Sequence, residues 1–140
     1  MTPALIPELA VTDCAVSLQF YCNILGFECE FQRPDEGFAY LTLGNAHLML
    51  DQIDKGRTFD QGHKPDRYPA GKGINLQIEV EDVDLLVVAL KSAGVSLFLP
   101  LEEKWYRQES NEAGNRQFIV ADPDGYLLRF FQDLGKRSLD

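Results

Sequence analysis

Cysteine and basic side chains are scarce in this chain of 140 residues. The three cysteines, Cys14, Cys22 and Cys29, cannot all pair with one another and form no Cys-x-x-Cys spacing. Neither a disulfide framework nor a zinc or redox motif is therefore indicated. Lys and Arg number 13 against 22 Asp and Glu, which gives a formal net charge of -9. This charge argues against nucleic acid as a partner, because binding to phosphates depends on basic side chains.

Long apolar runs are also missing. No stretch approaches the length of about 18 apolar residues that a membrane span needs, and the first seven residues carry no basic start. We therefore expect neither a membrane span nor a signal peptide, and the unpaired cysteines favour a cytoplasmic location. The hydrophobic content of 45% and charged content of 25% are typical of a globular protein with a proper core.

The chain contains one pattern twice, at an offset of 69 residues. Residues 9–13 and residues 78–82 each read as an alternating strand that ends in aspartate, a favoured helix N-cap. Apolar residues then recur every three or four positions, which predicts a helix after each aspartate. Gly26 and Gly94 are expected to end these helices, because glycine readily adopts the left-handed conformation of a C-terminal cap.

Hairpins follow both helices. Residues 38–50 contain two strands around the turn Gly44-Asn45, and residues 117–130 contain two around Asp122-Pro-Asp-Gly125. Each copy thus reads as a strand, a helix and three strands. We predict one domain over residues 1–140, with a first module at about 5–53, a linker at about 54–72, a second module at about 73–132 and a short C-terminal tail.

This order predicts an α+β fold of two βαβββ modules. Each helix can cover only one face of its sheet, so the other faces must find a partner. Related by a pseudo-twofold axis, they would form a curved, cup-like mixed sheet with the helices outside. Alignment of the last strands places Asp51 opposite Arg129, so about nine extra residues are expected within residues 101–113. The linker either joins the modules or folds over a site.

Several motifs together resemble a known family. Asp13, followed by Ser17-Leu-Gln-Phe-Tyr21 and Leu25-Gly-Phe27, and the later Asp122-Pro-Asp-Gly-Tyr-Leu-Leu128 are similar to the paired signatures of the glyoxalase/bleomycin resistance protein/dioxygenase (vicinal oxygen chelate) superfamily. The resemblance covers about residues 5–132. This scaffold is shared by glyoxalase I, extradiol dioxygenases, fosfomycin-inactivating transferases and bleomycin-binding proteins, so it implies the fold more narrowly than the chemistry.

The resemblance implies four positions at which the family's enzymes hold a divalent metal. By position these fall on Ile6, Asp51, Asn75 and Arg129. Ile6 has no donor atom, asparagine is a weak ligand and a guanidinium has no lone pair, so only Asp51 is credible. The pattern is therefore closest to the metal-free, bleomycin-resistance branch, and we expect no cofactor. Arg129 can instead pair with an acid or bind a carboxylate or phosphate.

Strand alternation and the inserted segment assign the ligand-binding side chains. They are Glu8, Phe38, Tyr40, His47, Met49, Asp51, Asn75, Gln77, Glu79, Trp105, Tyr106, Arg129 and Phe131. Aromatic rings stack on planar molecules and carboxylates attract cations. We therefore predict a non-enzymatic homodimer that binds and sequesters a small aromatic or cationic molecule, as bleomycin-resistance proteins do.

Other interpretations stay open. A displaced site for Zn, Ni, Mn or Fe would indicate a glyoxalase-like lyase or isomerase, or a dioxygenase; its residues would be Glu8, His47, Asp51 and Glu79. A regulatory or assembly module would instead fill its cup with large side chains such as Phe38 and Phe131. Among single residues, His47 can be an exposed surface histidine and Trp105 a packing residue.

Overall fold

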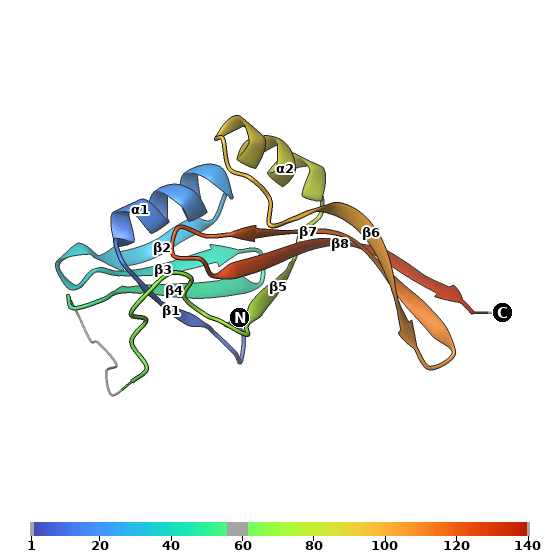
Figure 1. Ribbon diagram of the computed structural model, residues 1–140, viewed down its shortest axis with the longest axis horizontal. Helices are drawn as coiled ribbons and strands as arrows, with labels where there is room; N and C mark the ends of the chain where they lie inside the picture. The colour runs from blue at the N-terminus through green and yellow to red at the C-terminus, as the bar shows by residue number, and fades with distance from the viewer. Residues whose placement is uncertain (1, 56–61, 140) are drawn as a thin grey trace. The chain divides into compact units, whose positions relative to one another are not determined.

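The computed structural model describes residues 2–55 and 62–139 (Figure 1). By their contacts they form two compact units. The first comprises the described residues up to Gly73 together with the turn Asp122–Tyr126, and the second comprises Ile74–Ala121 and the residues from Leu127 onward. Each unit is a four-stranded mixed sheet with a helix, which confirms the predicted α+β class and the two βαβββ modules.

The first unit contains the first four strands. Its elements are β1 (Glu8–Val11), α1 (Cys14–Leu18), the π-helix η1 (Gln19–Ile24), β2 (Glu28–Arg33), the 3₁₀-helix η2 (Pro34–Glu36), β3 (Phe38–Leu43) and β4 (Ala46–Gln52). The strand order is β1-β4-β3-β2, with β1 parallel to β4 and the other neighbours antiparallel. Helices α1 and η1 lie along one face of this sheet (Figure 1).

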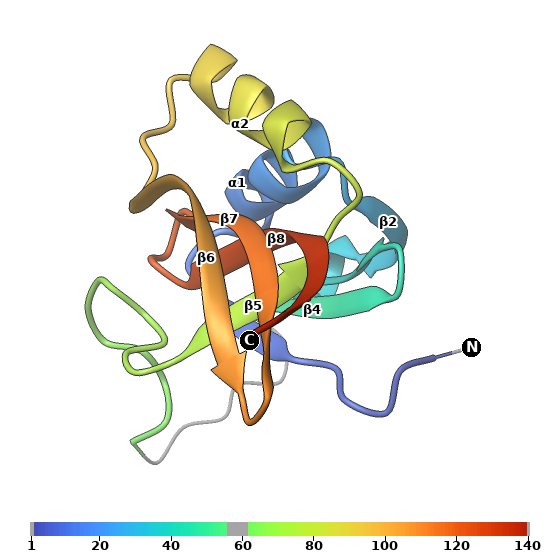
Figure 2. The same cartoon turned by 90° about the vertical axis from the view of Figure 1, so that its right-hand side faces the viewer.

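The second unit repeats this topology. Its elements are β5 (Asn75–Glu79), α2 (Val83–Ser92), β6 (Leu99–Gln108), β7 (Asn111–Ala121) and β8 (Leu127–Ser138). The order β5-β8-β7-β6 is the equivalent of the first, again with one parallel pair, β5 and β8. Figure 2 shows α2 on one face, with the β6–β7 hairpin running on past it. No helix in the described part of the chain is long and apolar enough to span a bilayer.

The predicted helix boundaries are confirmed by local geometry. Asp13 and Asp82 both have extended backbones and accept hydrogen bonds from backbone N–H groups of the first helical turn. Gly26 and Gly94 have φ values of 85° and 75°, a conformation that other residues rarely adopt. The helix side of each sheet is the apolar core; its fully buried members include Val11, Tyr21, Leu41, Leu50, Leu90, Phe118, Leu128 and Phe130.

Two glutamines occupy equivalent places in the two units. The side-chain oxygen of Gln52 accepts a hydrogen bond from the backbone N–H of Cys14 at 3.0 Å. Gln132 accepts in the same way from Val83, at 3.3 Å. Each therefore satisfies the first N–H group of its helix, which has no partner within the helix. Because Gln52 and Gln132 are 80 positions apart, the last strands are offset by 80 residues.

The predicted equivalence of Asp51 with Arg129 is therefore wrong by two residues. In the parallel strand pairs, Glu8 lies beside Met49 and Gln77 lies beside Arg129. Met49 is thus the counterpart of Arg129, and Phe131 is the counterpart of Asp51. A shift of two preserves the face on which a side chain lies, which explains why alternation still assigned the faces correctly.

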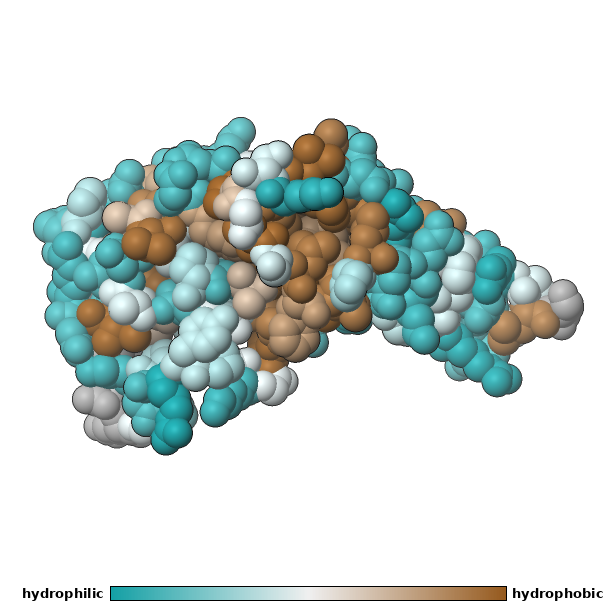
Figure 3. Space-filling view, turned by 45° about the horizontal axis from the view of Figure 1, so that its top comes forward, coloured by the Kyte–Doolittle hydropathy of each residue, from teal (hydrophilic) through white to brown (hydrophobic). Residues whose placement is uncertain are grey.

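The extra residues of the second unit lengthen its strands. β6, β7 and β8 have 10, 11 and 12 residues, whereas their counterparts β2, β3 and β4 have 6, 6 and 7. The end of the sheet that these strands form, on the right in Figure 3, presents mainly hydrophilic side chains. Elsewhere in the unit the exposed apolar side chains include Leu85 and Val88 on α2 and Phe98 before β6.

Candidate functional site

The face of the first sheet that lies opposite its helix carries six of the predicted ligand-binding residues. Phe38 pairs with Asp51 and Tyr40 pairs with Met49 across β3 and β4, so their side chains share one face. Leu41 and Leu50, on the opposite face, are fully buried. The members on the open face are Glu8, Phe38, Tyr40, His47, Met49 and Asp51.

Four rings form an aromatic row on this face: Phe38, Phe31, Tyr40 and His47. Phe31 stacks on Tyr40 with ring centroids 5.2 Å apart and planes at 16°, and it contacts Phe38 at 6.0 Å. His47 meets Tyr40 edge-on, and the Tyr40 hydroxyl lies 2.7 Å from His47 Nδ1. Phe31 is 50% exposed, so one of the stacked rings is open to a ligand.

The side chain of Arg33 makes a cation–π contact with one ring of the aromatic row. The guanidinium of Arg33 lies 4.1 Å from the centroid of the Phe38 ring and forms an ion pair with Glu36 at 2.8 Å. A positive charge over an aromatic face is favourable. Asp51 pairs with Phe38 in the sheet, and burial raises the pKa of its carboxyl despite the charge of Arg33. Aromatic and acidic groups therefore adjoin on this face.

Sequence reasoning did not assign Phe31 and Arg33 to the site. Glu28 and Cys29 pair with Thr42 and Leu41, but the register between β2 and β3 shifts between Cys29 and Phe31. This bulge reverses the alternation, because one extra residue moves all later side chains to the other face. Simple alternation from Glu28 would have placed Phe31 in the core. No strong sequence signal marks the bulge.

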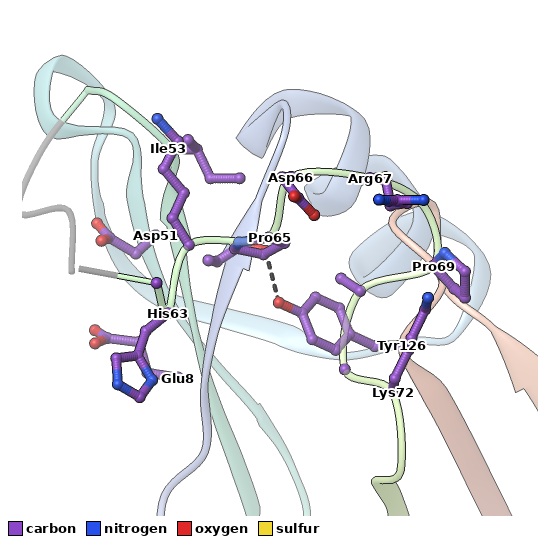
Figure 4. A pocket seen from close by; sticks show the side chains of 15 residues that line it. Glu8, Asp51, Ile53, His63, Pro65, Asp66, Arg67, Pro69, Lys72 and Tyr126 are labelled. Atoms are coloured by element: carbon purple, nitrogen blue, oxygen red, sulfur yellow. Dashed lines mark hydrogen bonds between the residues drawn. The ribbon is translucent and has the colours of Figure 1, made fainter. Parts of the chain in front are cut away.

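A cavity of about 700 Å³ adjoins the same face. Glu8 and Asp51 line it from the sheet, and residues 62–67 and 69–72 line it from the linker. The described part of the linker therefore borders this cavity, and its role as a cover over a site stays a prediction. Residues 56–61 of the linker lie outside the described residues. In Figure 4, Glu8, Asp51 and His63 lie toward one end of the cavity and Arg67 and Lys72 toward the other.

The turn Asp122–Tyr126 holds the linker in place. The Tyr126 hydroxyl donates to the carbonyl of Ala10 on β1 at 2.8 Å (Figure 4), and the backbone N–H of Ala70 donates to the carbonyl of Asp124 at 2.8 Å. Gly71 packs against the Tyr126 ring so closely that a Cβ there would lie 2.5 Å from a ring carbon. Two hydrogen bonds and a close contact at Gly71 thus hold this wall of the cavity, and the contact at Gly71 requires glycine.

The open face of the second sheet carries a different set of side chains. Its strand residues predicted as ligand-binding are Asn75, Gln77, Glu79, Arg129 and Phe131. Tyr106 of β6 joins them, since its hydroxyl accepts a hydrogen bond from Arg129. The combination of this face with the first sheet into one cup stays a prediction.

Trp105 lies on the other face of β6. Its ring packs on Gly114, where a Cβ would lie 2.6 Å from two ring atoms, and the guanidinium of Arg137 lies 3.9 Å from the ring centroid. Neighbouring residues of a strand point to opposite faces, so Trp105 and Tyr106 do not form one platform. Within this unit Trp105 is a packing residue, which was the second of the two roles predicted for it.

The metal positions of the family do not supply a ligand set. With the corrected register, the counterpart of Arg129 is Met49 and that of Asp51 is Phe131, so neither pair offers two oxygen or nitrogen ligands. Nor do any three His, Cys, Asp or Glu side chains within residues 2–55 and 62–139 come together as a metal site. Of the alternative set, Glu8, His47 and Asp51 share a face of the first unit, and Glu79 belongs to the second.

Comparison with known proteins agrees with this architecture. Residues 5–130 match the family model described as Glyoxalase/Bleomycin resistance protein/Dioxygenase superfamily. A bleomycin resistance protein of Geobacillus stearothermophilus is 31% identical over 136 residues, which are 92% of this chain and 96% of that protein. Among solved structures, TioX from Micromonospora sp. ML1 has a TM-score of 0.72 at 24% identity and covers 94% of this chain and 99% of its own. TnmS3, an antibiotic binding protein from Streptomyces sp. CB03234, has a TM-score of 0.61 at 19% identity, with 95% and 97% covered.

Proposed function

The chain belongs to the Glyoxalase/Bleomycin resistance protein/Dioxygenase superfamily, and from that premise we propose that it binds and sequesters a small aromatic or cationic molecule without transforming it. A bleomycin-like antibiotic is the leading candidate, because the curated relatives at 31% identity are bleomycin resistance proteins. The observation that carries the proposal is the aromatic row on the open face of the first sheet, beside a cavity that the carboxylates of Glu8 and Asp51 line from the sheet.

The ligand would use both features of this face. A planar ring can stack on Phe31, which is half exposed and already lies parallel to Tyr40. A positively charged group can then reach the acidic end of the cavity, where Glu8 and Asp51 contribute to the lining. Carboxylates in a partly enclosed cavity attract a cation more strongly than in water, because the dielectric constant is lower there. Such binding requires no catalyst and no metal.

Titration calorimetry with bleomycin, with and without copper, tests the proposal. We expect saturable binding and recovery of the drug chemically unchanged by mass spectrometry. If no heat is released or absorbed at high micromolar concentrations, bleomycin-like antibiotics are excluded as ligands. Stoichiometric Zn, Ni, Mn or Fe in protein purified without chelator would instead support the metal-dependent lyase, isomerase or dioxygenase.

The variant F31A locates the binding face. Loss of one stacking ring should weaken affinity by about fivefold to tenfold, since such contacts are worth about 1 kcal/mol. Phe31 is half exposed, so the fold should tolerate the change. F98A is the matched control, because Phe98 is also exposed but belongs to the second unit and is not part of the row. Equal effects of F31A and F98A would contradict the assignment.

A further inference from the structure

Side chains from all four strands of the second sheet form a hydrogen-bond network on its open face. Arg129 of β8 donates to the side-chain oxygen of Gln77 on β5 and, at 3.5 Å, to the hydroxyl oxygen of Tyr106 on β6. Gln117 of β7 donates to the same Tyr106 oxygen at 2.7 Å and to a carboxylate oxygen of Glu102 on β6 at 2.9 Å. Tyr106 therefore stands at the centre of the network.

The direction of each bond follows from the chemistry of the partners. A carboxylate only accepts, so the nitrogen of the Gln117 amide must face Glu102, and the same nitrogen is the donor to Tyr106. A guanidinium only donates, so Tyr106 also accepts from Arg129. Both acceptor positions of the Tyr106 oxygen are then used. Its own proton has no acceptor among the residues that the structure describes.

The positive charge of Arg129 is likewise unmatched. In the same sheet, Arg116 and Arg137 form ion pairs with Asp84 and Glu112 at 2.9 Å and 2.8 Å. Arg129 forms no ion pair within the described part of the chain; its acceptors there are a neutral amide and a neutral phenol. Its Nε is buried without a hydrogen-bond partner. A partly buried guanidinium without a counter-charge is unfavourable and is relieved by an anion.

We infer that Arg129 and Tyr106 form a binding site for the carboxylate of a small organic molecule. One carboxylate oxygen accepts a hydrogen bond from a free N–H of the guanidinium, and the other accepts one from the Tyr106 hydroxyl. Apolar side chains lie beside these donors, since Ile119 pairs with Arg129 and Phe131 pairs with Gln117. An aromatic or aliphatic carboxylate therefore fits better than an inorganic anion. A polyanion is disfavoured by the net charge of -9. The residues of this site all belong to the second unit, whereas the aromatic row and the cavity of the proposed function belong to the first.

NMR titration of the unaltered, isotope-labelled protein tests the inference. Benzoate is the probe, and benzamide is a neutral molecule of the same shape. We expect benzoate to shift signals of β6 and β8 saturably, and to bind about tenfold more tightly than benzamide, because hydrogen bonds to a charged group are the stronger ones. Equal binding of the two molecules, or no saturable shift with benzoate, would overturn the inference. Neither result depends on bleomycin binding to the first unit.

Two arginine variants locate the site. R129Q should reduce the affinity for benzoate to that of benzamide, whereas R116Q should leave it unchanged, because Arg116 lies on the helix side of the same sheet and pairs with Asp84. Equal losses in both variants would show a general charge effect and would refute the site. If a variant does not fold, the comparison of benzoate with benzamide on the unaltered protein still tests the site.

Discussion

At the scale of single residues, Asp122 combines burial with charge. It is only 3% exposed and accepts hydrogen bonds from the Tyr21 hydroxyl at 2.7 Å and from the backbone N–H groups of Asp124 and Tyr126 at 2.9 Å. Burial outweighs these bonds and raises the pKa of Asp122 to about 6. The pKa of Tyr21 is raised too, by its own burial and by the charge of Asp122, so its hydroxyl remains a donor.

This pKa predicts a pH-dependent stability. A carboxyl whose pKa is raised on folding, from 3.8 to about 6, stabilises the fold fully below pH 3.8, and this contribution is lost as the pH rises through 6. The difference corresponds to about 3 kcal/mol. Relative to D122N, the wild type should therefore lose about 2 to 2.5 kcal/mol of unfolding free energy between pH 4 and pH 7.5 in urea titrations.

The control for this prediction is D35N, which removes an exposed carboxylate in η2. The difference between wild type and D35N should change little over the same range of pH. A pH profile of D122N that runs parallel to that of the wild type would contradict the role of Asp122.

At the scale of elements, the long β6–β7 hairpin depends on one close contact. Gly114 pairs with Trp105, and a Cβ at Gly114 would lie 2.6 to 2.7 Å from three atoms of the indole ring. Arg137 covers the same ring and pairs with Glu112 at 2.8 Å. The far end of this sheet extends past α2. There Gly114, Trp105 and Arg137 pack on one another in place of the helix.

G114A should therefore destabilise the protein by about 1 to 3 kcal/mol, the usual cost of overpacking. Because Trp105 is the only tryptophan, its fluorescence should also change as the ring is displaced. In the W105A background the same substitution should cost much less, since the clashing ring is gone. A cost that is equal in both backgrounds would show that the contact with Trp105 is not responsible.

Elements differ in how far the sequence predicts them. The caps Asp13 and Asp82, the glycines that end the helices and the repeated strand order are local patterns, and the structure confirms them. The bulge before Phe31 and the offset of the last strands depend on which residues pair across a sheet. The residue types within a strand do not encode that pairing. The network around Arg129 was missed in part for the same reason: Gln117 was read as the start of a strand, whereas β7 begins at Asn111.

At the scale of the whole molecule, we predict a homodimer. The strands β2 and β6 are end strands of their sheets, and exposed sheet edges and faces are commonly completed by a second copy. Light scattering at micromolar concentration should give twice the mass of 15.8 kDa. A monomer under these conditions, with or without bleomycin, would contradict the prediction.

The β7–β8 turn (Asp122–Tyr126) packs as part of the first unit, although the strands on either side of it belong to the second. Tyr21 buries its hydroxyl on a carboxylate that the chain supplies only a hundred residues later. A fragment cut after Gly73 would keep its own four strands and yet leave that phenol without an acceptor and the linker without Tyr126 to pack against. Although the two modules share one plan, the first is incomplete as a separate protein and would need a peptide containing Asp122–Tyr126, added in trans, to close.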